Sequence, residues 1–265
     1  MVIDRYRRRV IAGAAALLPL AYGLRRWSST RAPAVPVLIG CCALDDGSFA
    51  AAIVDADLAL LRLITLPDRG HGVAVTRQGD RAVVLGRRPS RLATVIDLHR
   101  LEPIATIEAP YGRHFFGHGC FSQDGTVFYA TENDFDRVRS VLGVYDVTTG
   151  IRRVGEIDTS GIGAHEALML RDGETIVVAN GGIETHPDYP RRKLNLADME
   201  PSIAYLRARD GALLEQVALE SHWHQVSLRH LAEAVDGSVW IGGQFEGVGH
   251  APLVFRHQRG APRLE

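Results

Sequence analysis

Four histidines occupy equivalent places in this sequence. Each begins a segment that continues through a short apolar stretch, a turn containing Asp and Gly, and a second apolar stretch; the segments start at His71, His118, His165 and His230. The first two intervals are both 47 residues long, and the third is 65 because of an additional loop. Imidazole nitrogens bind zinc, copper, iron and nickel, so histidines that converge from such repeats would form a metal site.

The elements that carry these histidines are predicted to be β-strands. Apolar runs rich in Val, Ile, Ala and Leu alternate with turn dipeptides such as Asp46-Gly47, and no uninterrupted amphipathic helix of usual length follows residue 30. The period is in the range of a β-propeller blade. The sequence therefore predicts an all-β propeller of four-stranded blades over residues 35–265. About five blades are visible, which leaves a closed five-bladed ring and an incomplete six- or seven-bladed ring open.

The first strand of each blade in a propeller lines the central channel, so equivalent positions of successive blades meet near the axis. We therefore expect the four histidines to form a nitrogen-rich ring that binds a transition metal such as iron, copper or zinc. Iron would favour an added carboxylate, and Glu166 and Glu132 are the nearest candidates in the sequence.

A structural role would explain the same histidines. Propellers of the WD type carry a Gly-His pair between an outer and an inner strand, where the histidine holds a turn by hydrogen bonding. Gly70-His71 and Gly117-His118 are similar to such pairs. Because repeats inherit structural residues as readily as ligands, both interpretations stay open at this point.

A long polar loop after Asn180 is a second candidate site, since loops of this length in compact domains are usually functional or disordered. We expect it to cover one mouth of the channel, beside Arg87-Arg88 and the second-strand ends of other blades. A plain interface loop is the alternative. The candidate ligand-binding residues in these places are Glu132, Asn133, Glu166, Asn180, Lys193, Asn195 and Gln244.

The first 34 residues are strongly basic, with seven arginines and one aspartate. Tyr6-Arg7-Arg8-Arg9 and the following apolar stretch are typical of a twin-arginine signal, and the stretch is too short to span a bilayer. Residues 1–34 are therefore predicted to be a signal peptide and the protein to be periplasmic, meeting a membrane only through this segment if it is uncleaved. The remaining chain is acidic, which argues against a nucleic-acid partner.

Three blocks of the sequence resemble a known family. They are FFGHGCFSQDGTVFYATENDFD, GIGAHEALMLRDGETIVVANGGIETHPDYPRRKLNLADMEPSIAYL and HWHQVSLRHLAEAVDGSVWIGGQFEG. The chain is similar to domain of unknown function 1513, a family of exported bacterial proteins, over roughly residues 35–258. The resemblance implies a propeller with a twin-arginine signal. Members are typically longer at the C-terminus, which leaves ring closure open. Because members are often encoded beside imelysin-type periplasmic iron-uptake proteins, the resemblance also implies such partners and a part in iron acquisition.

Motifs of common enzymes are absent from the sequence: there is no nucleophile elbow, phosphate loop, zinc-protease helix or CxxC pair. The expected function is a non-enzymatic periplasmic binding protein associated with iron acquisition. One alternative is a metal-dependent, lactonase-like hydrolase or an oxidoreductase. The hydrolase would need an open coordination position on its metal and a nearby carboxylate that acts as the base. The other alternative is a protein-interaction scaffold whose channel is filled by side chains.

Overall fold

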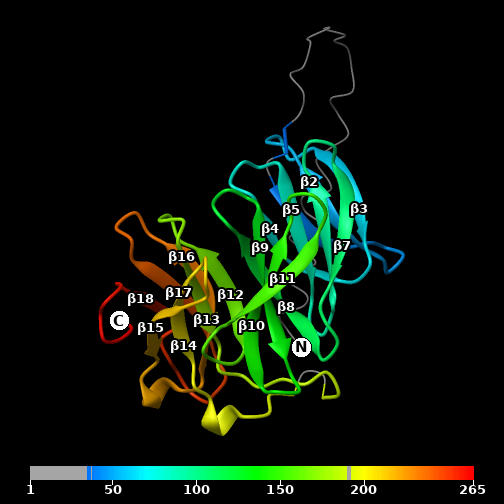
Figure 1. The fold of residues 1–265 in the computed structure, drawn as a ribbon. Helices are drawn as coiled ribbons and strands as arrows, with labels where there is room; N and C mark the ends of the chain where they lie inside the picture. Colours follow the sequence, from blue (N-terminus) through cyan, green and yellow to red (C-terminus); the bar gives the residue numbers. More distant parts are fainter. Residues whose placement is uncertain (1–34, 37, 190–191) are drawn as a thin grey trace, which may run out of the picture. The chain divides into compact units, whose positions relative to one another are not determined.

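The repeated strand pattern is present in the computed structural model, which describes residues 35–36, 38–189 and 192–265. Its strands form five antiparallel sheets that follow one another in chain order (Figure 1). The predicted signal peptide of residues 1–34 lies outside the described residues. The helical elements among the described residues are two short 3-10 turns, and no described helix is long and apolar enough to cross a membrane.

The first and last sheets have three strands each, and the three sheets between them have four. The first two sheets contain β1 (Leu38–Ala43), β2 (Phe49–Val54) and β3 (Leu60–Leu66), and then β4 (Gly70–Val75), β5 (Arg81–Gly86), β6 (Leu92–Asp97) and β7 (Glu102–Glu108). The third contains β8 (Arg113–Phe121), β9 (Val127–Asp134), β10 (Arg139–Asp146) and β11 (Arg152–Asp158). The fourth contains β12 (Ala164–Met169), β13 (Thr175–Asn180), β14 (Ser202–Arg207) and β15 (Leu213–Ala218), with the 3-10 turn η1 (Leu196–Asp198). The last contains η2 (Ser221–Trp223), β16 (Val226–Glu233), β17 (Val239–Phe245) and β18 (Val254–His257).

Tight turns built by Asp and Gly join neighbouring strands, as the dipeptides predict. Between β8 and β9, one carboxylate oxygen of Asp124 accepts hydrogen bonds from the Ser122 hydroxyl at 2.6 Å and from the Thr126 backbone N–H at 3.1 Å. Gly125 follows with a φ of +73°, which a side chain would strain. The dipeptide therefore fixes where β8 ends and β9 begins.

Side chains that alternate along a middle strand enter two different cores. Ile176 and Val178 of β13 pack with the third sheet, whereas Val177 and Ala179 pack with the fifth. Successive residues of a strand point to opposite faces, so a strand between two sheets must be apolar on both. This requirement explains the continuous apolar run of β13, and it stacks the sheets in chain order.

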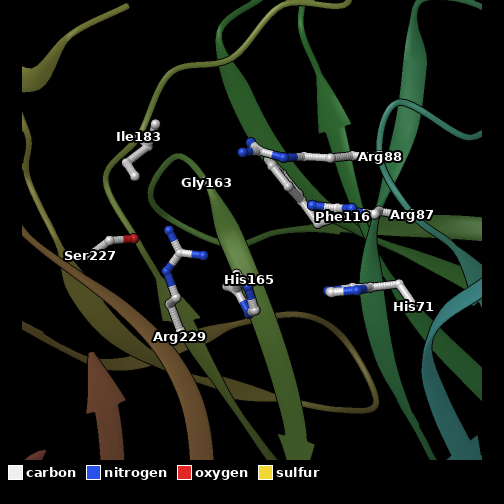
Figure 2. Close-up of a pocket in the computed structure, with 9 residues that line it drawn as sticks. All are labelled: His71, Arg87, Arg88, Phe116, Gly163, His165, Ile183, Ser227 and Arg229. Atoms are coloured by element: carbon white, nitrogen blue, oxygen red, sulfur yellow. The ribbon is translucent and has the colours of Figure 1, made fainter. Parts of the chain in front are cut away.

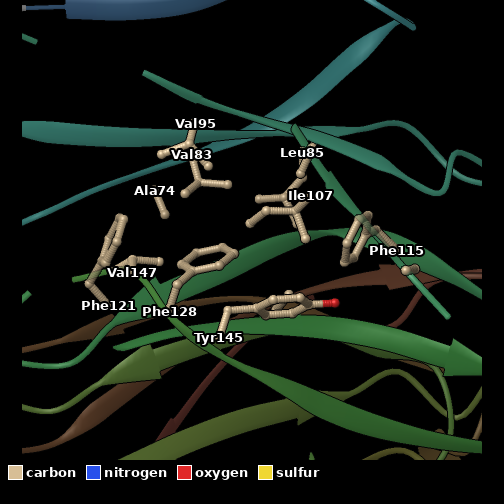
Figure 3. Close-up of a cluster of buried hydrophobic side chains, with 13 residues drawn as sticks. Ala74, Val83, Leu85, Val95, Ile107, Phe115, Phe121, Phe128, Tyr145 and Val147 are labelled. Carbon is tan, nitrogen blue, oxygen red and sulfur yellow. The ribbon is translucent and has the colours of Figure 1, made fainter. Parts of the chain in front are cut away.

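Large aromatic side chains fill the interface between the second and third sheets. Phe115, Phe128 and Tyr145 of the third sheet are at most 2% exposed, and they pack against Leu85 and Ile107 of the second (Figure 3). Burial of one such side chain contributes about 1.5–3 kcal/mol. These contacts hold β4 and β8, the first strands of the two sheets, side by side.

The architecture confirms the predicted all-β propeller of four-stranded blades, with an opening in the ring. The first strands β4, β8, β12 and β16 contact one another in that order, and β1 contacts β4. Among the described residues, no strand of the fifth sheet pairs with the first sheet, and no hydrophobic cluster joins the two. The sheets are therefore not closed into a ring.

Candidate functional site

The four repeated histidines meet where the inner strands of four sheets approach one another. The ring centroid of His118 lies 4.7 Å from that of His165, 4.9 Å from that of His71 and 5.3 Å from that of His230. His165 and His230 are 4.9 Å apart. The convergence expected from the repeat is thus present, and His118 contacts each of the other three rings.

Irregular strand pairing places these side chains. In each inner strand the register with its neighbour is interrupted at or directly before the histidine: between Gly70 and Val73 in β4, Phe115 and Gly119 in β8, Ala164 and Glu166 in β12, and Leu228 and His230 in β16. Such bulges re-aim side chains and are common beside functional sites. One consequence is that adjacent residues, His165 and Glu166, both reach the cluster, which a regular strand would not allow.

Glycines beside two of the histidines let β4 and β8 approach closely. A Cβ on Gly117 would lie 2.5 Å from Cδ2 of His71, and its φ is +103°. A Cβ on Gly72 would lie 2.2 Å from the Gly117 carbonyl oxygen. Among the described residues, neither His71 nor His118 makes a hydrogen bond that holds a turn. The glycine of the Gly117-His118 pair thus allows close contact between β4 and β8, which carry His71 and His118.

Burial and mutual proximity keep the central imidazoles neutral. Desolvation, followed by neighbouring imidazoles, lowers the pKa of His118 to about 4 and the pKa of His165 to about 2. The pKa of His71 is also lowered, first by burial and then by Arg87. A neutral imidazole has one ring nitrogen with a free lone pair, so these side chains have the protonation state that a metal ligand requires.

Two ring nitrogens of the cluster have no hydrogen-bond partner. Nε2 of His118 and Nδ1 of His165 are both buried without one. Leaving a buried polar atom unsatisfied costs about 1–3 kcal/mol, so such atoms are uncommon in proteins and mark places where a bound group can supply the partner. The unpaired nitrogens lie on the two histidines with the lowest pKa values.

Potential ligand atoms form two overlapping groups that share His118. One atom from each of His71, His118 and His165 lies within 4.8 Å of the others, and the same holds for His118, Glu166 and His230. Glu166 accepts hydrogen bonds from the Leu231 backbone N–H at 2.8 Å and from Nδ1 of His230 at 3.2 Å. Burial raises the pKa of Glu166. One group offers three imidazoles and the other two imidazoles and one carboxylate, and both are sets that suit iron, zinc or copper.

A cavity of about 120 Å³ lies beside the histidines (Figure 2). His71 and His165 line it together with the arginines Arg87, Arg88 and Arg229. A larger cavity of about 710 Å³ shares those three arginines and is also lined by His114, His186, Lys193 and Gln244. The histidine cluster is therefore bordered by space for a ligand on one side.

Two of the predicted ligand-binding residues, Lys193 and Gln244, line the larger cavity. The Lys193 ammonium donates to Glu246, which also accepts a hydrogen bond from Arg229 at 3.0 Å. Asn195 does not line this cavity and instead joins two parts of the long loop. Its amide nitrogen donates to the Gly182 carbonyl at 2.8 Å, and its amide oxygen accepts from the Glu184 N–H at 2.7 Å.

Asn133 and Asn180 are buried and bonded to backbone groups. The Asn133 side-chain amide donates to the Thr185 carbonyl at 3.0 Å and to Nε2 of His114 at 3.1 Å. The Asn180 amide donates to the Thr159 carbonyl at 2.8 Å. The Asn133 contact with Thr185 attaches the long loop of the fourth sheet to the third sheet, and the Asn180 contact joins the end of β13 to the residue after β11.

Glu132 lies in a buried ion-pair network of the third sheet. Its carboxylate accepts hydrogen bonds from the Tyr145 hydroxyl at 2.7 Å, from Arg153 at 3.0 Å and from Arg113 at 3.2 Å. Arg113 also pairs with Asp134. The carboxylate is fully buried and saturated by protein donors, unlike that of Glu166.

Sequence reasoning did not single out Arg229, Ser227 or Phe116, which line the smaller cavity. Arg229 precedes His230 directly, at the place that glycine occupies before His71 and His118. That exchange of glycine for arginine within the repeat is the signal that could have identified it.

Comparisons with known proteins give a family and a fold. A family model described as "Protein of unknown function (DUF1513)" matches residues 64–264. A search of curated proteins finds no match. Among solved structures, a hydrazine synthase chain of Kuenenia stuttgartiensis superposes with a TM-score of 0.59 at 18% identity, covering 88% of this chain and 65% of that one. A functionally unknown protein from Desulfotomaculum acetoxidans DSM 771 gives 0.56 at 13% identity, covering 86% and 68%.

These likenesses concern the fold alone. The chain spans 65% of the hydrazine synthase chain that it matches, so that protein's activity is not carried over.

Proposed function

The chain belongs to the DUF1513 family of proteins of unknown function, and we propose that it is a binding protein that holds a transition metal at its histidine cluster. The observation that carries the proposal is the convergence of four imidazoles, two of which have buried nitrogens without a partner. Metal coordination would satisfy these nitrogens. The donors of each group come from three different sheets, so a bound ion would also fix those sheets to one another.

The donor types support iron as the first metal to test. His118, His230 and Glu166 form a set of two imidazoles and one carboxylate, which is typical of non-haem iron sites. His71 and His165 add imidazoles that zinc and copper also accept. The family resemblance favours iron for a separate reason, the association of family members with iron-uptake proteins.

Export to the periplasm is part of the proposal. The support is the twin-arginine pattern at Arg7, Arg8 and Arg9 in the sequence. Twin-arginine export carries folded proteins, so the metal could be loaded before export. Partners of the imelysin type fit this location. Replacing Arg7 and Arg8, the pair that precedes Arg9, Val10 and Ile11, by lysine should retain the full-length chain in the cytoplasm, as cell fractionation would measure; unchanged export would contradict this part.

Elemental analysis of the protein purified from the periplasm tests the metal site. We expect near-stoichiometric iron, zinc or copper in the wild type and its loss in His118→Ala and His165→Ala. His99→Ala is the matched control, because His99 lies on an exposed turn outside the cluster. Equal metal in all four proteins, with circular dichroism spectra alike, would contradict the proposal.

A metal-dependent hydrolase is a second candidate, favoured by the cavity beside His71 and His165. Space next to the donors would admit a substrate, and Glu166 could act as the base on a metal-bound water. The metal-loaded protein should then hydrolyse members of a lactone panel, and Glu166→Gln should lose that activity. A binding protein would show no turnover in either form.

A further inference from the structure

Three arginines from distant parts of the chain point toward one space beside the histidines. Arg87 and Arg88 follow β5 in the second sheet, and Arg229 lies at the bulge of β16 in the fifth. Figure 2 shows their guanidinium groups directed into the same cavity as the imidazoles of His71 and His165. Placing three like charges around one cavity is unfavourable unless negative charge balances them.

The protein supplies little of that negative charge. Within the described residues, neither Arg87 nor Arg88 pairs with a carboxylate. Arg229 donates to Glu246 at 3.0 Å, but Glu246 is shared with Lys193. Among the described residues that line the larger cavity, the one carboxylate is that of Asp68. The cavity mouth is therefore rich in positive charge.

Burial adds to this imbalance. Nε of Arg229 is buried without a hydrogen-bond partner. Desolvation, followed by Arg229 and Arg87, lowers the pKa of Arg88. An incoming anion would relieve both the unpaired donor and the mutual repulsion.

We propose that Arg87, Arg88 and Arg229 form a receptor for a small oxyanion, a carboxylate or phosphate group, in the cavity beside the histidine cluster. Guanidinium groups present forked N–H donors that match carboxylate and phosphate oxygens. The cavity of about 120 Å³ has room for a group of a few heavy atoms, because about 10–15 Å³ of space measured with a water-sized sphere holds one water. The larger cavity that shares these arginines can hold the rest of a polycarboxylate.

This site goes beyond the proposed metal site, because it uses different residues and needs no metal. The two sites adjoin, however, so an oxyanion held by the arginines would lie next to an ion held by His71 and His165. A metal bound in an anionic carboxylate or phosphate complex would fit the two adjoining sites, because the arginines would hold the anion and the histidines the metal.

Isothermal titration of the chelator-treated protein at low ionic strength tests the inference, with citrate and inorganic phosphate as separate probes. We expect at least one to bind with a dissociation constant below about 1 mM. Citrate binding indicates a carboxylate ligand and phosphate binding a phosphate ligand. Arg88→Gln and Arg229→Gln should each weaken binding about tenfold or more. Arg77→Gln is the matched control, since Arg77 is exposed in the turn between β4 and β5.

Absence of binding by both probes, or equal binding in the three variants, would overturn the inference. Metal content measured on Arg88→Gln separates this site from the metal site: we expect it to equal that of the wild type. Arg88→Lys keeps the charge but removes the fork, so it should bind between wild type and Arg88→Gln. Thermal unfolding confirms that each variant is folded.

Discussion

Two groups of polar side chains among the described residues, the ion-pair network of Glu132 and the histidine cluster, are built in opposite ways. In the third sheet, both oxygens of the Glu132 carboxylate are matched by donors from two arginines and a tyrosine hydroxyl, and Nε of Arg153 is the buried atom there without a partner. In the histidine cluster, nitrogens of His118 and His165 have no partner within the protein. A carboxylate whose hydrogen bonds are all made within the protein stabilises the fold. A group that lacks partners costs free energy, and the packing around it must keep it in place. The difference separates structural polar residues from candidate ligands.

The largest effect is expected in the saturated network. Glu132→Gln removes the fully buried carboxylate that Arg113 and Arg153 share and leaves them paired with Asp134 and Glu156. Because breaking a buried pair costs about 3–5 kcal/mol when no other partner remains, that figure is the upper limit here. Urea denaturation should show this loss in the free energy of unfolding. The metal content per folded chain should stay at the wild-type level. A variant as stable as the wild type would remove the distinction between the two groups.

Metal addition should act only through the unsaturated group. At a free metal concentration about 100 times the dissociation constant, binding to the native state alone raises the free energy of unfolding by about 2.7 kcal/mol. Thermal or urea unfolding with and without a chelator measures this gain. It should persist in His99→Ala and disappear in His118→Ala. The same gain in both variants would place the metal elsewhere.

Acid should weaken the third-sheet network through Glu156, which accepts a hydrogen bond from Arg113 at 2.6 Å and is more exposed than Glu132. Arg113 is the first cause that lowers the pKa of Glu156, from 4.5 to about 2 in the folded protein. A lowered folded pKa means that the stabilisation is complete above the unfolded pKa and is lost as the pH falls from about 4.5 toward 2. Over that interval, the wild type should lose more stability than Glu156→Gln. Urea unfolding at several pH values measures the stability of both proteins. The same dependence of stability on pH in the wild type and in Glu156→Gln would contradict this.

The smallest effect is expected when the unsaturated group is made apolar. His165→Leu removes a nitrogen that has no partner, so the metal-free protein should change in stability by about 1 kcal/mol or less, or become more stable. His114→Leu is the comparison, because both nitrogens of buried His114 are hydrogen-bonded, and it should lose about 1–3 kcal/mol. Urea unfolding with chelator present measures both variants. Equal losses in the free energy of unfolding would mean that the unpaired nitrogen of His165 does not destabilise the protein.

Much of the fold was predictable from the repeats. The Asp-Gly turns and the apolar runs between them set the strand boundaries, and the spacing of His71, His118 and His165 placed one histidine at the same strand of successive sheets. The bulges that carry these histidines were not predictable, because a register shift depends on the neighbouring strand. Arg229 lies at such a bulge, so the sequence shows that it departs from the glycine of the repeat but not that it reaches the cavity.

The sequence alone determined an all-β chain with an equivalent histidine on the first strand of each of four sheets, because hydrophobic alternation and turn residues are local properties. Only the tertiary structure decided which polar residues are satisfied. Glu132 and Glu166 were equivalent candidates in the sequence, yet Glu132 is enclosed by arginines and Glu166 contacts His230. Burial and charge pairing depend on side chains brought together from distant segments, and no local pattern contains them.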